Sequence, residues 1–194
     1  MTDFIKLCVT RDTLKSLRGK GIDSEINAVL SLVAKEMDKK YIVCGLNSSD
    51  YSYPEFDIAS DMERAKELAS SNAKMFFDYD VVEHSGDNGK LRLVYRSDES
   101  FEFYVAEIYE IYDPYLVVYH HAYDGVSFRV NGFTTEMEAY DLMNRSIQYA
   151  LNNWVTVDPE PYEYGDREYT LDDDNQWHHW EFVNVKELSD YPDD

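Results

Sequence analysis

Hydrophobic residues recur at helical spacing in three parts of the chain. Residues 23–39, 60–76 and 135–153 each place apolar side chains three or four positions apart, which gives every one of these segments an apolar face. Residues 60–63 and 135–138 have the spacing of a capping box, in which a hydroxyl and a carboxylate bond to the first backbone amides of a helix. The pattern therefore predicts three amphipathic helices.

Shorter apolar runs between turn residues predict β-strands. The runs cover 41–46, 80–84, 90–96, 115–122, 126–132 and 177–185. Asn88-Gly89 and Asp124-Gly125 each lie between two such runs, and these dipeptides supply the positive φ angles of a tight hairpin turn. Residues 47–55 are polar, and we expect them to form a loop.

The stretch FEFYVAEIYEIY, residues 101–112, fits two periodicities. As a helix it would have an apolar face on one side and Glu102 and Glu110 on the other. Its aromatic and β-branched residues favour a strand instead, and residues 97–100 are short enough for a hairpin loop. We expect a strand that ends at Asp113, before a proline.

Together these elements predict an α+β fold. In this interpretation an antiparallel β-meander over about 80–132 packs against the three amphipathic helices. Residues 1–157 would form a single α+β domain. Periodicity is lost after Asp158, so 158–194 is expected to be an acidic, partly irregular, tyrosine-rich extension with one strand, packed on the same domain.

Charge is distributed very unevenly along the chain. The 194 residues include 39 acidic and 18 basic ones, for a net charge of −21. Residues 1–96 hold 16 acidic and 14 basic residues, whereas 97–194 hold 23 acidic and 4 basic ones, a net charge of −19. Direct binding to DNA, RNA or an anionic membrane is disfavoured, because all three repel so negative a protein.

Composition also bears on the compartment. The two cysteines, Cys8 and Cys44, lie in short apolar runs and are expected to be buried, reduced thiols. The chain has no apolar leader and no long apolar stretch, so we expect a soluble cytoplasmic protein, located in the host cytoplasm if it is viral.

The histidines raise a metal hypothesis. Two His-His dipeptides occupy 120–121 and 178–179, and adjacent residues on a strand face opposite ways, so each dipeptide can give only one ligand to a site. Zinc or iron would need one histidine from each dipeptide and a carboxylate such as Asp174 or Glu181. The spacing matches no short metal motif, and the chain has no nucleophile or phosphate-loop motif. We expect no cofactor, no metal and no enzymatic activity.

The acidic half has a charge comparable with that of nucleic acid. A compact domain of this length is roughly 42 Å across, and duplex DNA carries about 25 charges over that length. Carboxylates at alternate positions of an extended chain lie roughly 6.7 Å apart, about two phosphate rises along one DNA strand. Tyrosines accompany these carboxylates and could fill the gaps of a groove built for nucleic acid.

The predicted partner-binding residues are carboxylates and tyrosines of the acidic half. They are Asp158, Glu160, Tyr162, Glu163, Tyr164, Asp166, Glu168, Tyr169, Asp172, Asp173 and Asp174, supported by Glu99, Glu102 and Glu110.

In size and acidity the chain resembles the small acidic inhibitors that bacteriophages make against host restriction or CRISPR systems. The resemblance implies a non-enzymatic DNA mimic that blocks the basic groove of a nucleic-acid-binding host protein. One alternative is an acidic phage-type structural or accessory protein without an inhibitory role. A second is a metal-dependent enzyme that uses the His-His dipeptides. The basic segment 11–20 could also pair with the acidic half of a second copy in a homodimer.

Overall fold

The computed structural model describes residues 10, 13, 15, 23–37, 39–48, 50–87, 90–97, 101–122, 126–154, 162–173 and 176–188. By its internal contacts the chain divides into two units, residues 1–39 and 40–194. In the first unit, helix α2 spans Asp23–Met37, which confirms the first predicted helix, and its Ile26 and Val33 are buried. Of the basic segment 11–20, only residues 13 and 15 are described.

The second unit contains two antiparallel sheets. The five-stranded first sheet has the order β2-β1-β5-β4-β3, with the bounds β1 Lys40–Asn47, β2 Asp50–Ala59, β3 Val81–Asp87, β4 Lys90–Arg96 and β5 Phe103–Ile111. The four-stranded second sheet has the order β7-β6-β9-β8, with the bounds β6 Tyr115–Ala122, β7 Val126–Phe133, β8 Glu168–Asp173 and β9 Gln176–Asn184. The two helices are α3, Met62–Phe76, and α4, Glu136–Asn153.

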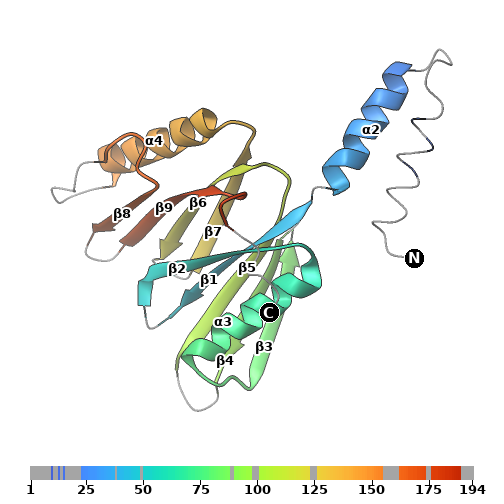
Figure 1. Ribbon diagram of the computed structural model, residues 1–194. Helices are drawn as coiled ribbons and strands as arrows, with labels where there is room; N and C mark the ends of the chain where they lie inside the picture. The colour runs from blue at the N-terminus through green and yellow to red at the C-terminus, as the bar shows by residue number, and fades with distance from the viewer. Residues whose placement is uncertain are drawn as a thin grey trace. The chain divides into compact units, whose positions relative to one another are not determined.

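The two sheets face each other, and one helix covers the outer face of each (Figure 1). Apolar side chains of both sheets, such as Ile42 and Val118, form the core between them. Ala65, Ala69 and Ala73 of α3 pack on the first sheet, and Met143 and Ile147 of α4 pack on the second. Strands in the middle of each sheet are therefore buried on both faces.

The predicted meander on three helices is wrong. Residues 81–111 do form a meander, but β5 and β6 are not neighbours, and the chain crosses at 112–114 into the second sheet. The central strands carry apolar residues on both faces, which is more than one layer of helices can cover, so the other face packs on a second sheet. The fold is two facing antiparallel sheets with a helix on each outer side.

A second correction concerns the predicted loop at 47–55. Most of it belongs to β2, which pairs with β1 in the register Tyr41↔Ala59 to Gly45↔Glu55. Strand β2 lies at the edge of its sheet, and an edge strand tolerates Pro54 because one row of its backbone groups makes no ladder bonds.

Other local predictions are confirmed. Residues 101–112 contain strand β5, and both predicted hairpins are present as β3–β4 and β6–β7. The predicted N-terminus of the third helix is also present, since the side chain of Thr135 accepts from the amide of Glu138. In α3, however, the N-cap is Asp61, whose carboxylate accepts from the Arg64 amide at 2.9 Å.

Close packing in the first sheet depends on Gly45. A Cβ at this position would overlap the phenol of Tyr104, which crosses β1 and donates to the carboxylate of Glu55 at 3.0 Å. Strand β1 therefore admits only glycine where the ring passes over it.

No helix in the described part of the chain is long and apolar enough to cross a membrane.

Candidate functional site

The predicted site residues fall in several places. Asp158, Glu160, Asp174 and Glu99 lie outside the described residues. Asp172 and Asp173 lie at the end of β8, where only the backbone is described.

Segment 162–168, which ends at the first residue of β8, carries the predicted residues that the structure brings together. Glu163, Asp166 and Glu168 are exposed, and Tyr164 is 58% exposed. The Tyr164 hydroxyl donates to the carboxylate of Asp141 on α4 at 3.0 Å. This bond favours the protonated phenol and raises the pKa of Tyr164. The segment is thereby held against the outer helix.

Two tyrosines of the prediction serve packing instead. Tyr169 is buried in the core beneath α4, and Tyr162 is half-buried beside it, with the two rings edge to face at 5.5 Å. Their rings are not available as exposed anchors.

Glu102 and Glu110 lie apart from this segment. Both are exposed, but Glu110 belongs to β5 of the first sheet and Glu102 directly precedes that strand. Alternation along β5 puts Glu110 on the same face as Tyr104 and Ile108, which α3 covers. Glu110 therefore lies on the side of the first sheet that α3 covers, and not on the side of the molecule that α4 covers.

Helix α4 contributes carboxylates that the sequence interpretation missed. Glu136, Glu138 and Asp141 are exposed on its first two turns. We call these three residues, together with Glu163, Tyr164 and Asp166, the α4 acidic face. The sequence pattern of Glu136 and Glu138 was interpreted only as helix capping. The feature that could have marked them as part of an acidic surface is the excess of acidic over basic residues in the C-terminal half.

The α4 acidic face is not neutralised by nearby cations. Among the described residues, none of its five carboxylates forms an ion pair. Arg145 donates to the backbone carbonyl of Asp141, and Arg167 is bound to Glu187 at 2.7 Å. The carboxylate of Glu138 instead accepts from the hydroxyl of Thr135 at 2.8 Å.

Aromatic packing fixes this face on the second sheet. The ring of Tyr140 on α4 stacks on Phe182 of β9, with centroids 4.3 Å apart and an interplanar angle of 10°. The buried Trp180 donates from its indole N–H to Ser146 of α4 at 2.8 Å. Rigid support of this kind lowers the entropy lost when a surface binds a partner.

The two His-His dipeptides meet across neighbouring strands. In the register of β6 and β9, His120 lies opposite His179 and His121 opposite His178. Alternation places the first pair between the sheets and the second pair under α4. The rings of His121 and His178 stack at 4.6 Å, and Trp154 stacks on His178 at 4.9 Å.

His120 is fully buried, and neither of its ring nitrogens has a hydrogen-bond partner among the residues that the structure describes. Burial and the neighbouring histidines lower its pKa to about 3, so it is neutral at physiological pH. Its ring packs at 5.1 Å from that of Phe128 on β7.

The arrangement for a metal is only partly present. His120, His179 and Glu181 share one face of the second sheet, as the metal hypothesis required, and Asp174 lies outside the described residues. However, no group of three or more His, Cys, Asp or Glu side chains in the described ranges could hold a metal ion.

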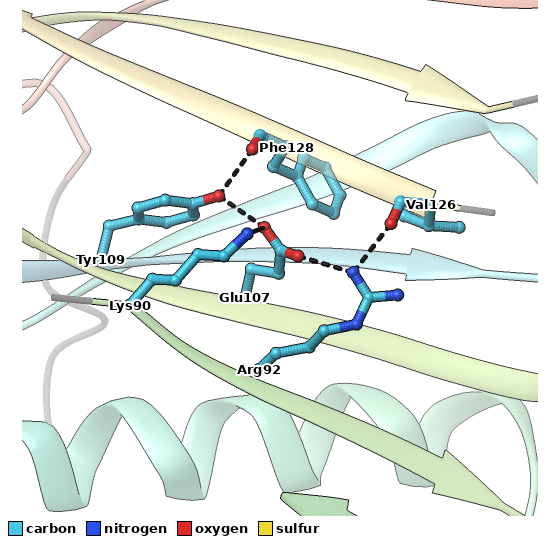
Figure 2. Close-up of polar contacts among 6 residues, drawn as sticks. All are labelled: Lys90, Arg92, Glu107, Tyr109, Val126 and Phe128. Atoms are coloured by element: carbon cyan, nitrogen blue, oxygen red, sulfur yellow. Dashed lines mark hydrogen bonds and ion pairs between the residues drawn. The ribbon is translucent and has the colours of Figure 1, made fainter. Parts of the chain in front are cut away.

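A buried ionic network joins the two sheets (Figure 2). Glu107 of β5 is fully buried and accepts from Lys90 at 3.0 Å and from Arg92 at 2.6 Å, both on β4. Arg92 also donates to the carbonyl of Val126 on β7 at 2.8 Å.

Tyr109 completes this network. Its hydroxyl is placed to bond both the carboxylate of Glu107 and the carbonyl of Phe128, which lies 2.7 Å away. Burial, and the bond to the carboxylate, raise the pKa of Tyr109, so the phenol keeps its proton. The sequence signal was an acid, Glu107, in the middle of an apolar strand, and the structure pairs it in register with Arg92.

Comparisons of the chain with protein families, with curated proteins and with solved structures found no match.

Proposed function

We propose that this protein is a non-enzymatic inhibitor that occupies the cationic groove of a nucleic-acid-binding protein. The α4 acidic face is the surface that it would present to the groove. The observation that carries the proposal is the absence of ion pairs at the five carboxylates of this face in the described part of the chain. Unpaired surface carboxylates are available to lysine and arginine side chains that otherwise bind phosphates.

Exposed apolar and aromatic area supports a protein partner. Met137 on α4 is 67% exposed and Tyr164 is 58% exposed, beside Glu136 and Asp141. Large side chains of this kind bury substantial area when they bind, and they frequently carry much of the affinity at protein interfaces. A purely solvating acidic surface gains nothing from them.

The test uses proteins from a bacterial lysate that are retained on heparin, which selects those with cationic grooves. We expect the immobilised protein to capture a specific component of this fraction and duplex DNA to release it. Capture should weaken as salt rises, because the contact is between charges.

Two variants of equal charge change identify the surface. The first carries Glu136→Gln, Asp141→Asn and Glu163→Gln on the α4 acidic face. The matched control carries Glu63→Gln, Glu67→Gln and Glu83→Gln on the first sheet and its helix. We expect capture to fail only with the first variant. Equal capture by both variants, or capture that duplex DNA does not compete, would rule out the proposal.

A further inference from the structure

A cavity of about 700 Å³ opens at the edge of the second sheet, where β8 begins and β9 ends. Its polar lining comes from Asp166, Arg167, Glu168, Glu181, Asn184 and Glu187. We call it the edge cavity. A volume of this size is typical of sites for small organic molecules rather than for single ions.

Two carboxylates of the edge cavity face each other, and no lysine or arginine of the described residues forms an ion pair with either. Glu168 of β8 lies directly opposite Glu181 of β9 in the ladder. Directly opposed residues of an antiparallel pair have Cβ atoms roughly 5 Å apart, and like charges at this distance destabilise the sheet. The nearby cation, Arg167, is already bound to Glu187 at 2.7 Å.

His179 is an independent sign that Glu181 is placed for a ligand. Its side chain is 5% exposed, and its Nδ1 is 2.9 Å from the hydroxyl of Thr170. Its Nε2 points to the Glu181 carboxylate but stays 3.5 Å away, too far for a hydrogen bond, and has no other partner among the described residues. Among the described residues, this long contact with His179 is therefore the one ion pair that Glu181 makes, and its side chain is 31% exposed.

Asn184 and Glu187 define the rest of the polar wall. The Asn184 amide donates to Glu187 at 3.0 Å, so Glu187 is fixed by both this amide and Arg167. These bonds lower the pKa of Glu187 and keep it ionised. Glu168 and Glu181 remain as the acceptors that a ligand can use.

The chemistry of the lining favours a planar organic cation. No three described His, Cys, Asp or Glu side chains could hold a metal ion, which argues against a divalent metal. A guanidinium group has five N–H donors in one plane and can bond two carboxylates along different edges. An ammonium group is a point charge with no such preference.

We propose that the edge cavity binds the guanidinium group of an organic ligand, with Glu168 and Glu181 as its two carboxylate acceptors. The cation replaces the repulsion between the two side chains with charge-assisted hydrogen bonds. The site shares Asp166 of its lining with the α4 acidic face, but its two acceptors, Glu168 and Glu181, do not belong to that face, and its occupancy does not depend on the function proposed above.

Calorimetric titration of the full chain tests this assignment with two probes of equal charge. We expect butylguanidinium to bind at one site per chain and butylammonium to bind at least about tenfold more weakly. Glu181→Gln and, separately, the exposed Glu168→Gln should each weaken butylguanidinium by at least about tenfold. The control variant Glu63→Gln on α3 should leave the affinity unchanged. The Glu168 variant keeps the test valid if the Glu181 variant does not fold.

The source of the guanidinium is resolved by a further pair of titrations. Tighter binding of acetyl-Gly-Arg-Gly-amide than of butylguanidinium supports an arginine of a protein partner, and the reverse supports a small molecule. The proposal is overturned by equal affinity for the two butyl cations, by unchanged affinity in both glutamate variants, or by displacement of butylguanidinium with stoichiometric calcium. The α4 variant that carries Glu136→Gln, Asp141→Asn and Glu163→Gln should bind butylguanidinium normally, which separates this site from the proposed inhibitory surface.

Discussion

The two sheets of the second unit, each with its outer helix, differ in whether their acidic residues are paired with cations. In the first sheet, the buried Glu107 is compensated by two cations, and its outer helix α3 pairs Lys66 with Glu63 at 2.8 Å and Arg64 with Glu67 at 3.3 Å. On the second sheet's outer helix α4, the carboxylates of Glu138 and Asp141 accept from neutral hydroxyls, and no carboxylate of this helix forms an ion pair with a described residue. The difference shows that the charge a surface presents to a partner depends less on its number of acidic residues than on how many of them are paired with a cation.

The largest expected effect is the loss of the buried charge in the first sheet. Glu107→Gln leaves Lys90 and Arg92 without their carboxylate, so the free energy of unfolding should fall by about 3 to 5 kcal/mol. Urea denaturation measures this change. The matched variant Glu110→Gln, at an exposed position of the same strand, should change stability by no more than about 0.5 kcal/mol. Similar losses in both variants would contradict a special role for the compensated network.

Acid should weaken the second sheet through His120. Its pKa is lowered to about 3 in the folded protein, so between about pH 6.5 and pH 3 the unfolded chain binds the proton more strongly. This contribution to stability is complete above pH 6.5 and is lost as the pH falls. We expect a loss of roughly 2 kcal/mol by pH 4.5.

The groups around His120 define the control. His179 lies opposite it on β9, Phe128 packs on it from β7, and His121 and His178 add to the effect of burial. In His120→Leu the loss of stability between pH 7 and pH 4.5 should shrink, whereas in the exposed His84→Gln it should not. An unchanged pH profile in His120→Leu would show that acid acts elsewhere.

The two helix caps give a smaller contrast. Asp61 caps α3 with a carboxylate at 2.9 Å, and Thr135 caps α4 with a hydroxyl at 3.4 Å. Asp61→Ala should cost about 1 kcal/mol and Thr135→Ala roughly half as much, because the charged and shorter bond is the stronger one. Thermal unfolding of both variants checks the order, and a larger loss in Thr135→Ala would reverse the comparison.

Surface neutralisation should give the smallest effect and an opposite sign on the two helices. At low salt, Glu136→Gln on α4 should raise stability by a few tenths of a kcal/mol, because it removes repulsion from unpaired neighbours. Glu63→Gln on α3 should lower stability by about 0.5 kcal/mol, since it breaks a pair with Lys66. Both differences should fade in 1 M salt. If both variants changed stability in the same direction, the proposed difference in charge pairing between α3 and α4 would be wrong.

Local structure was largely predictable from the sequence, whereas the pairing of strands was not. Residues 41–46 and 60–76 follow simple periodicities, and a hairpin dipeptide fixes β3 against β4. Nothing local says whether the strand after Pro114 continues one sheet or begins another. The usable signal was that strands such as β1 are apolar at consecutive positions, which requires cover on both faces.

The candidate site was less predictable than the fold. The excess of acid indicates the C-terminal half, but it does not show which side chains are exposed, because exposure depends on packing: Tyr169 is buried while Tyr164 is not. Glu136 and Asp141 join the surface only because α4 lies beside segment 162–168. Residues this far apart in sequence cannot be grouped without the tertiary fold.

The bonds that Arg92 and Tyr109 make to Val126 and Phe128 have a consequence for assembly. Strand β7 is one border of its sheet, and the carbonyls of these two residues already accept from side chains of the other sheet. An extra strand from another polypeptide that paired there would compete with these bonds. Extension of this sheet by strand addition is therefore directed to β8 at the opposite border.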